Sequence, residues 1–384
     1  MPKTRSVKKA KVKYLPYASG FIPPSKEEQV KAIGCRSFVA PEYSLLSDDK
    51  DYEFFKQIPQ PTSIDDWLAQ YVDNGQTFQQ YVSRCPWLFS QKLDGIEQTF
   101  IHTGGNLCEK YPDGKIYLLP IGHFHRKYFI DFDELVKFAN IYLGIPVCTL
   151  PGVDLKINIK EKKANWINKQ SNSPLKDDSG SFLQFHHELE GRFYSKHNRY
   201  QLSISNLLSI LQLNIPNDAL CVIGLTMSDL YREEADLFVA GWAARRSRVA
   251  VFSFFRYDPS LTFSPADWFI QRRNQGMKPQ QIQKSIFQRS CKLLVHEIGH
   301  LLGIGHCIFF QCCMNGSGHL SEDFRQPMHL CPVDLHKLQT LVGFNVLKRY
   351  SNLLDFYTKH GMKDEVEWIS RRIDFINNSP VEII

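Results

Sequence analysis

Long apolar runs are missing from this sequence. No segment holds the ~20 consecutive apolar residues that a membrane-spanning helix requires, so we expect no membrane-embedded part. Residues 1–14 are basic and lack the apolar core of a secretory signal, which predicts an intracellular protein. We expect a cytoplasmic location. The basic tail leaves the nucleus as an alternative, although a flexible solvated tail is the simpler interpretation.

Cysteine spacing typical of a secreted disulfide framework is also lacking. Together with the missing signal, this favours a reducing compartment, in which isolated cysteines pack as small apolar residues and clustered cysteines bind metal. No nucleic-acid-binding motif accompanies the net charge of +6, so no specific nucleic-acid partner is expected. Six of the ten cysteines stand alone, at Cys35, Cys85, Cys108, Cys148, Cys221 and Cys291.

One segment carries the spacing of a catalytic zinc site, H-E-x-x-H-x-x-G-x-x-H, with ligand candidates His296, His300 and His306. Apolar residues recur at near-helical spacing from 279 to 302, which predicts a buried helix. Four residues make about one turn, so the first two histidines share a face of this helix. Gly303 suits the helix end, after which the chain can turn and bring back the third histidine. Three protein ligands leave a fourth position for water, which is the catalytic pattern.

Glu297 lies beside the first histidine and is the candidate general base. Its offset of one residue places it near the open side of the metal rather than in the ligand set. There it can accept a proton from zinc-activated water that attacks a peptide carbonyl, and later deliver that proton to the leaving amine. A purely structural zinc site has no need of such a base.

A cysteine cluster follows directly after the third histidine. Cys307, Cys312 and Cys331 can face away from the catalytic metal and offer three thiolates to a second, structural zinc. Structural zinc takes four ligands, and Asp334 is the candidate fourth, although it also suits the N-cap of a helix starting near Leu335. Other residues that could replace it are His329, His336 and Cys313.

The histidine motif, the following C-x-M and the later C-P resemble the archaemetzincin family of zinc metallopeptidases. The similarity extends to residues 219–231 and to the helix after Asp334, over about 117–354 in all. It implies two zinc ions per chain, one catalytic and one structural, and a Met-turn at Met314, an apolar floor under the histidines. It also implies aminopeptidase-like or narrow peptide specificity. The family has cysteine where this chain has Asp334.

The resemblance implies a zincin- or metzincin-like α+β fold. We expect a twisted mixed sheet with helices above the active-site helix, and a mostly helical C-terminal subdomain with the second zinc site. Residues 1–90 form an N-terminal extension with the basic tail. Residues 91–384 form the metallopeptidase domain, with an upper subdomain to about 303 and a lower one at 304–384.

Patterns of apolar and polar residues predict where the strands and helices of this fold lie. Strands are expected at 115–121, 146–150, 191–195, 220–226 and 249–255, and the last is either a substrate-pairing edge strand or a core strand. Helices are expected at 26–32, 64–82, 131–142, 201–211 and within 335–376, and a surface loop at 165–184. Ser25 and Glu28 form a capping box for the first helix.

These patterns together predict a monomeric zinc metallopeptidase that acts on peptide or protein substrates. Two other interpretations stay open. The first is a catalytically weak, zinc-stabilised protein that binds peptides without cutting them. The second is a nucleic-acid-binding protein that uses the basic tail and the cysteine-bound zinc. Histidines at 123, 125, 186 and 187 receive no metal role.

Overall fold

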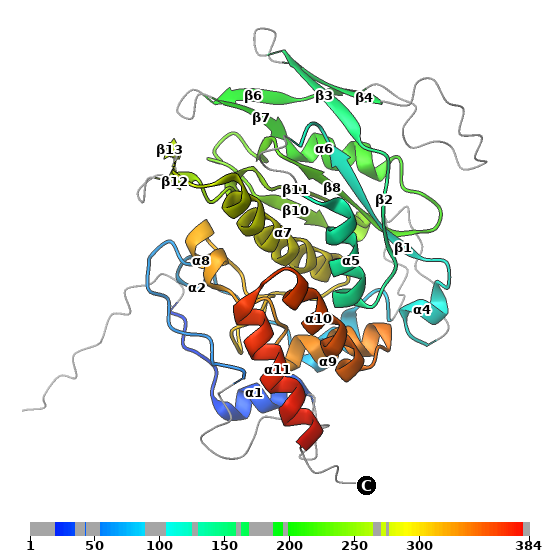
Figure 1. The fold of residues 1–384 in the computed structure, drawn as a ribbon, viewed down its shortest axis with the longest axis vertical. Coiled ribbons are helices and arrows are strands. Elements are labelled where there is room, and N and C mark those ends of the chain that lie inside the picture. Colours follow the sequence, from blue (N-terminus) through cyan, green and yellow to red (C-terminus); the bar gives the residue numbers. More distant parts are fainter. Residues whose placement is uncertain are drawn as a thin grey trace, which may run out of the picture.

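The computed structural model describes residues 20–34, 43, 54–88, 105–124, 130–158, 163–168, 187–194, 199–263, 270–273 and 276–378. A mixed sheet lies at one end of the molecule and a group of helices at the other, with the long helix α7 (Pro279–Leu301) between them (Figure 1). The predicted α+β class is therefore confirmed. The basic tail and most of the loop expected at 165–184 lie outside the described residues.

The main sheet has the strand order β10-β11-β8-β1-β3-β4-β5, and β2 also pairs with β1. The strands β1, β2, β3, β8 and β11 pair in parallel, whereas β10 at one edge and β4 and β5 at the other are antiparallel additions. In sheet order the bounds are Gly241–Ala244, Val249–Ser253, Ala219–Thr226, Lys115–Ile121, Val153–Asn158, Lys163–Asn168 and His187–Leu189, with β2 at Val147–Thr149. Two smaller sheets consist of β12 (Leu261–Phe263) with β13 (Ile270–Arg273), and of β6 (Gly191–Tyr194), β7 (Arg199–Ser203) and β9 (Asp229–Tyr231).

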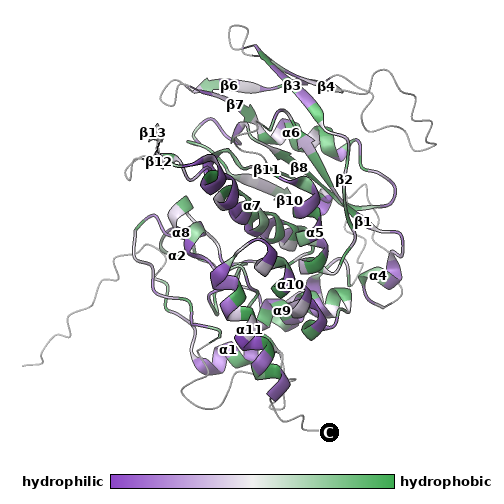
Figure 2. Cartoon of the chain, in the orientation of Figure 1, coloured by the Kyte–Doolittle hydropathy of each residue, from purple (hydrophilic) through white to green (hydrophobic). Residues whose placement is uncertain are grey.

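Strand β8 lies inside the main sheet, between β11 and β1, and all eight of its residues are buried. Its continuous apolar run is typical of a parallel strand covered on both faces. Val222 packs in the apolar cluster with Leu207 and Leu211 of α6 (Ile204–Gln212), while Ile223 belongs to the cluster that contains α7. Figure 2 shows hydrophobic residues gathered along these central strands. The sheet therefore holds α7 through an apolar face.

The remaining helices surround α7 and fill the lower part of the molecule (Figure 1). Helix α5 (Phe132–Leu143) contacts both α7 and β2, and α10 (Val346–Lys359) contacts α5 and α11 (Lys363–Asn378). No helix among the described residues is both long and apolar enough to span a bilayer. The other helices are α1 (Lys26–Ile33), α2 (Trp67–Gln70), α3 (Phe78–Arg84), α4 (Leu107–Lys110), α8 (Leu320–Arg325) and α9 (Pro332–Val342), and short 3₁₀ turns lie at Arg245–Ser247 and Phe255–Tyr257.

The N-terminal residues pack against the helical part of the molecule. Helices α1 and α3 contact α9, and Gln57 forms an isolated bridge with Phe310. The predicted capping box is present at the start of α1, where Glu28 Oε2 accepts from the Ser25 N–H at 2.7 Å. A domain boundary near residue 90 stays a prediction, but the described residues before it contact the chain beyond it.

Three expectations from the sequence need adjustment. Strand β11 lies inside the sheet, between β8 and β10, so the core interpretation of 249–255 is confirmed and β10 is the edge strand. The helix expected from residue 201 begins at Ile204, because residues 199–203 pair in β7 and Ser203 caps the helix. The helix expected at 64–82 is two short helices, α2 and α3, separated by residues 71–77, which are in neither helix.

Candidate metal centre

Helix α7 and the turn after it bring three histidines together. His296 and His300 lie one turn apart on α7, and their ring centroids are 4.7 Å apart. Gly303 has a φ of 87°, a left-handed conformation that favours glycine and ends the helix as predicted. The chain then reverses, and the ring of His306 lies 4.8 Å from that of His300. One ligand atom from each of the three lies within 4.8 Å of the others.

Two of these imidazoles are oriented by backbone carbonyl groups. His296 Nδ1 lies 2.7 Å from the carbonyl oxygen of Cys313, and His300 Nδ1 lies 2.8 Å from that of Ile304. A carbonyl oxygen can only accept, so each Nδ1 carries the proton and each Nε2 keeps its lone pair. Burial lowers the pKa of His296 to about 3 and that of His300 well below its usual value. Both rings are thus neutral at pH 7, as metal binding requires.

The third imidazole is oriented by the N-terminal part of the chain. Asp73 Oδ2 lies 3.2 Å from His306 Nδ1 and also accepts from the indole N–H of Trp67 at 2.9 Å. The Trp67 ring meets the imidazole edge-on, at 4.8 Å between centroids. Sequence spacing offers no signal for this contact, because Asp73 precedes its histidine by 233 residues.

Glu297 lies near one acidic and one basic side chain, Asp323 and Arg245. Burial raises the pKa of its carboxyl group to about 8, and the nearby Asp323 raises it too, whereas Arg245 acts against this shift. Arg245 lies in the turn after the edge strand β10, and its Nη2 is 3.2 Å from His300 Nδ1. The sequence indicated no role for Arg245. A bound dication would also lower this pKa, because it stabilises the carboxylate.

Met314 packs against the helical turn that carries the first two histidines. Its side chain is 1% exposed, and a Cβ added to Gly299 would lie 2.7 Å from its sulfur. The backbone carbonyl of Met314 accepts from the N–H of Cys307 at 2.8 Å. The side chain therefore lies at the position where the sequence predicted an apolar floor, and it contributes packing.

The cysteine cluster forms a second, fully buried group. Ligand atoms of Cys307, Cys312, Cys331 and Asp334 all lie within 4.8 Å of one another. The sulfurs of Cys307 and Cys331 are 3.6 Å apart, and Asp334 Oδ2 lies 3.2 Å from Cys312 Sγ. The other oxygen of this carboxylate, Oδ1, pairs with Lys337 Nζ at 2.8 Å. Three thiols and one carboxylate oxygen thus face one point, a donor set that fits a structural zinc ion.

The alternatives for the fourth ligand lie elsewhere. His329 stacks on Trp368 at 4.0 Å between ring centroids, and His336 stacks on Phe78 at 3.6 Å. Among the described residues, Cys313 does not belong to the group of possible ligands that contains the other three cysteines and Asp334. The N-cap interpretation of Asp334 is wrong, because Pro332 starts helix α9 and Cys331 is its N-cap residue.

The members of a third group of possible ligands are engaged in hydrogen bonds within the protein. Asp66, His319 and Glu322 lie together, but His319 Nε2 donates to Asp66 at 2.8 Å and Glu322 accepts from the backbone N–H groups of Trp67 and Gly318. These hydrogen bonds join the N-terminal residues to α8 and to the residues just before it. Of the histidines given no role, His187 lies in β5 and His123 follows β1, while 125 and 186 lie outside the described residues.

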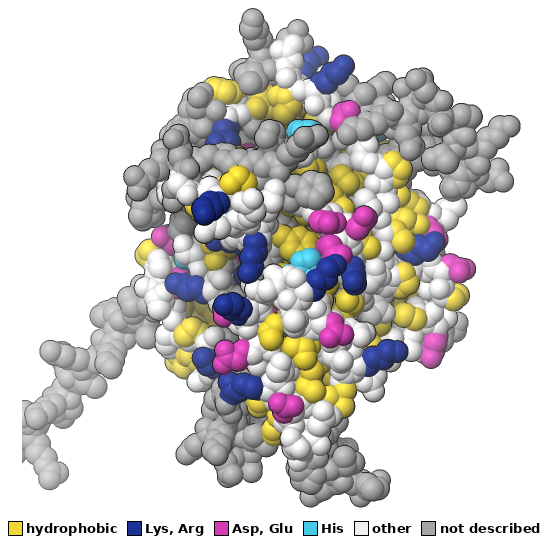
Figure 3. All heavy atoms as spheres, viewed as in Figure 1, with side chains coloured by type: hydrophobic (Ala, Val, Ile, Leu, Met, Phe, Trp, Pro, Cys, Tyr) yellow, Lys and Arg dark blue, Asp and Glu magenta, His cyan; other side chains and the backbone are white. Residues whose placement is uncertain are grey.

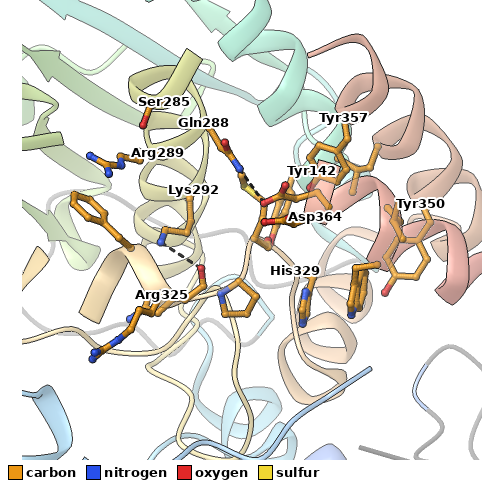
Figure 4. Close-up of a pocket in the computed structure, with 18 of the residues that line it drawn as sticks. Tyr142, Ser285, Gln288, Arg289, Lys292, Arg325, His329, Tyr350, Tyr357 and Asp364 are labelled. Carbon is orange, nitrogen blue, oxygen red and sulfur yellow. Dashed lines mark hydrogen bonds between the residues drawn. The ribbon is translucent and has the colours of Figure 1, made fainter. Parts of the chain in front are cut away.

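A pocket of about 440 Å³ extends along α7, toward its N-terminus from the histidines. Figure 4 shows Ser285, Gln288, Arg289 and Lys292 of α7 on one side and Asp364 on the other. Neither Glu297 nor any of the three histidines His296, His300 and His306 lines this pocket. Figure 3 shows basic and acidic side chains interspersed over this face of the molecule. The pocket therefore adjoins the candidate metal centre without being part of it.

The region that contains the candidate metal centre is similar to known proteins. Residues 280–340 match peptidase family M54. The chain is similar to archaemetzincin-2 of Rattus norvegicus, 38% identical over 164 residues, which are 40% of this chain and 46% of that protein. It is also similar to archaemetzincin-1 of Homo sapiens, 36% identical over 177 residues, which are 40% of this chain and 34% of that protein. The match thus spans less than half the length of these curated relatives.

Solved structures show a more distant similarity. One is an archaemetzincin from Archaeoglobus fulgidus complexed with malonate, with 22% identity and a TM-score of 0.35, covering 58% of this chain and 99% of that one. Another is an archaemetzincin from Methanopyrus kandleri, with 21% identity and a TM-score of 0.37, covering 60% of this chain and 97% of that one. The resemblance predicted from the motifs is confirmed by the family and sequence matches.

Proposed function

We propose that the chain is a zinc metallopeptidase, because it carries the peptidase family M54 motif and resembles the archaemetzincins. The observation that carries the proposal is the convergence of three imidazoles beside the half-buried Glu297. Two of the rings are neutral and present Nε2 because their Nδ1 atoms are engaged by carbonyl groups. The donor set therefore fits a catalytic zinc ion with one position left open.

Each side chain of the centre has a defined task in this proposal. His296, His300 and His306 would hold the zinc, which when bound supplies a Lewis acid and lowers the pKa of a water molecule to about 7. Glu297 accepts a proton from the attacking water and donates it to the leaving amine.

The cysteine cluster would hold a second, structural zinc ion. Cys307, Cys312 and Cys331 supply thiolates and Asp334 a carboxylate oxygen, four negative charges in all. A dication together with the ammonium group of Lys337, which is fully buried against Asp334, offsets three of them. The position of Asp334 Oδ2, 3.2 Å from Cys312 Sγ and in one group with all three cysteines, supports Asp334 as the fourth ligand in place of the cysteine expected from the family.

The substrate in this proposal is a peptide in an extended conformation. Strand β10 is one of the two edges of the main sheet among the described residues, its backbone can pair with such a peptide, and it contacts α7. An aminopeptidase-like or otherwise narrow specificity stays a prediction from the resemblance. Peptides with free and acetylated N-termini, offered to the same preparation, would test it. Cytoplasmic or nuclear location and a monomeric state are likewise predictions.

The decisive experiment replaces the proposed base and keeps the ligands. We expect Glu297→Gln to bind zinc as the wild type does and to lose ~10²–10⁴-fold in peptide hydrolysis, the contribution usual for general acid–base catalysis. Glu188→Gln on strand β5, an exposed acidic residue paired with Lys163, is the matched control and should retain activity. A chelator should abolish activity, and added zinc should restore it.

The outcomes separate the proposal from its alternative. Undiminished hydrolysis by Glu297→Gln would contradict the assigned base. A wild-type protein that binds peptides in a zinc-dependent way but never yields products would favour a zinc-stabilised binding protein.

A further inference from the structure

The N-terminal residues 67–87, here called the strap, close the C-terminal end of α7. The last carbonyl groups of a helix have no partners within the helix and need donors from elsewhere. Four strap side chains donate to three consecutive carbonyl groups at and just beyond the helix end. The donors are Trp87 Nε1 to Leu301 at 2.9 Å, Tyr81 Oη and Cys85 Sγ to Leu302 at 3.1 and 3.5 Å, and Gln76 Nε2 to Gly303 at 3.1 Å.

The strap also holds the turn that leads to the third histidine. Gln76 Oε1 accepts from the N–H of Gly305 at 2.9 Å, so its amide group binds both ends of the turn between Gly303 and Gly305. The backbone carbonyl of Gln76 accepts from Lys337 Nζ at 2.5 Å. Because Lys337 also pairs with Asp334, the strap is linked to the cysteine cluster as well as to the histidines.

Asp73 is the strap residue that touches a candidate ligand directly. Its Oδ2 faces His306 Nδ1 at 3.2 Å and accepts from Trp67 Nε1 at 2.9 Å, while its Oδ1 accepts from the N–H of Gly75 at 2.9 Å. Both oxygens are therefore engaged, and the carboxylate has one defined position. The Trp67 ring adds an edge contact that restricts the imidazole.

The three histidines differ in what orients them. The partners of His296 and His300 are carbonyl groups of Cys313 and Ile304, within the segment that carries the motif. His306 depends on a carboxylate from a part of the chain outside residues 280–340, the range that matches the peptidase family. Its orientation is thus set by the strap.

We propose that Asp73 is a positioning residue of the candidate metal centre and that the strap is a structural part of that centre. The inference rests on the proposed function, because it requires that the three histidines bind a metal ion. The carboxylate holds the Nδ1 proton of His306 in place, aims Nε2 at the other two ligands and increases the basicity of the ring. Such partners of metal-binding histidines are typically worth 10- to 100-fold in metal affinity.

The test is a cobalt titration of the full-length chain with a competing chelator. Cobalt bound by the cysteine cluster shows thiolate-to-metal charge transfer, so binding at the two sites can be followed separately. The variants are Asp73→Ala, Asp73→Asn and the matched control Asp65→Asn. Asp65 lies two residues before the strap, and among the described residues its carboxylate has no hydrogen bond to a histidine. Thermal unfolding of each metal-free variant reports any general loss of structure.

We expect Asp73→Ala to weaken cobalt binding at the histidine site about 10- to 100-fold and to leave the thiolate signal unchanged. Its metal-free melting temperature should fall only by what the lost hydrogen bonds to Trp67 and Gly75 cost. Asp73→Asn should lose less, because its amide oxygen can still accept from His306, and Asp65→Asn should match the wild type. Histidine-site affinity within about twofold of the wild type in Asp73→Ala would overturn the inference. Equal losses at both sites with a lower melting temperature would also overturn it, because they indicate general destabilisation.

A different outcome of the same titration would contradict the proposed function itself. If the wild-type chain binds no cobalt at the histidine site, the proposed function is wrong and this inference falls with it. If the wild type binds cobalt and Asp73→Ala binds it equally well, the inference alone is wrong.

Discussion

The ion pair between Asp334 and Lys337 is the feature of the cysteine cluster most open to a quantitative test. Its two charged atoms lie 2.8 Å apart, and both side chains are 0% exposed. Burial raises the pKa of Asp334 to about 6, although the ammonium of Lys337 lowers it. The informative perturbation is Lys337→Met, which keeps an unbranched side chain of similar length and removes the charge.

The expected loss depends on whether a metal ion occupies the cluster. At an effective dielectric constant of about 20, two unit charges 2.8 Å apart attract by about 6 kcal/mol. Desolvation of the buried ammonium offsets part of this, so breaking the pair should cost ~3–5 kcal/mol in metal-free protein. Protonation of Asp334 limits the cost to the lower part of this range. A zinc ion beside Asp334 would supply a replacement positive charge, so the loss should be smaller with metal bound.

The assay is chemical denaturation of wild-type and variant protein, each with a chelator and with excess zinc. Lys348→Met is the matched control, because Lys348 is exposed on α10 and such a change should alter the free energy of unfolding by less than about 0.5 kcal/mol. The double variant with Asp334→Asn completes a cycle that isolates the energy of the pair.

Two results would refute the reasoning. A loss of the same size with and without zinc would show that Asp334 does not share its charge with a metal ion. A loss below about 1 kcal/mol in metal-free protein would show that the pair contributes no more than an exposed ion pair.

Two further predictions concern other parts of the molecule. Glu134 of α5 accepts from Lys359 at 2.6 Å and from His360 at 2.7 Å, and these contacts, that with Lys359 foremost, hold its pKa below the ordinary value of 4.5. The stabilisation is therefore present above that value and disappears as the pH falls through the lowered pKa. Denaturation should show Glu134→Gln losing roughly 1 kcal/mol at pH 7, and this loss should shrink steadily as the pH falls below 4.5. Met314→Ala should lose ~2–5 kcal/mol in thermal or chemical unfolding, and Met314→Leu less than ~1.5 kcal/mol; equal losses would contradict a packing role.

The sequence predicted those elements whose signals are local. Helix α7 was expected to end at residue 302 and ends at Leu301, because the positive φ of Gly303 stops it. Strand β1 has the predicted bounds, and β8 starts one residue early. The site residues predicted from spacing lie together for the same reason, because a helical turn and a short reversal suffice to bring three histidines to one point.

The partners of those residues could not be predicted in this way. Asp73 and Arg245 reach the centre through the tertiary arrangement, and neither lies in a periodic pattern or at a fixed distance from the motif. Residues 1–90 were expected to form an N-terminal extension, but the contacts of the strap are side-chain hydrogen bonds, which leave no periodicity in the sequence. The edge position of β10 likewise follows from strand order, which the apolar run of β11 does not reveal.

The distance along the chain between the strap and α7 has a kinetic consequence. Gln76 and Gly303 are 227 residues apart, and Trp87 and Leu301 are 214 apart. Contacts between such distant residues close large loops and form late, since the entropy of loop closure opposes them. During synthesis the strap emerges first and has to wait until α7 has left the ribosome before it can dock. We therefore expect the third histidine to acquire its final orientation late in folding, after the sheet and α7 have come together.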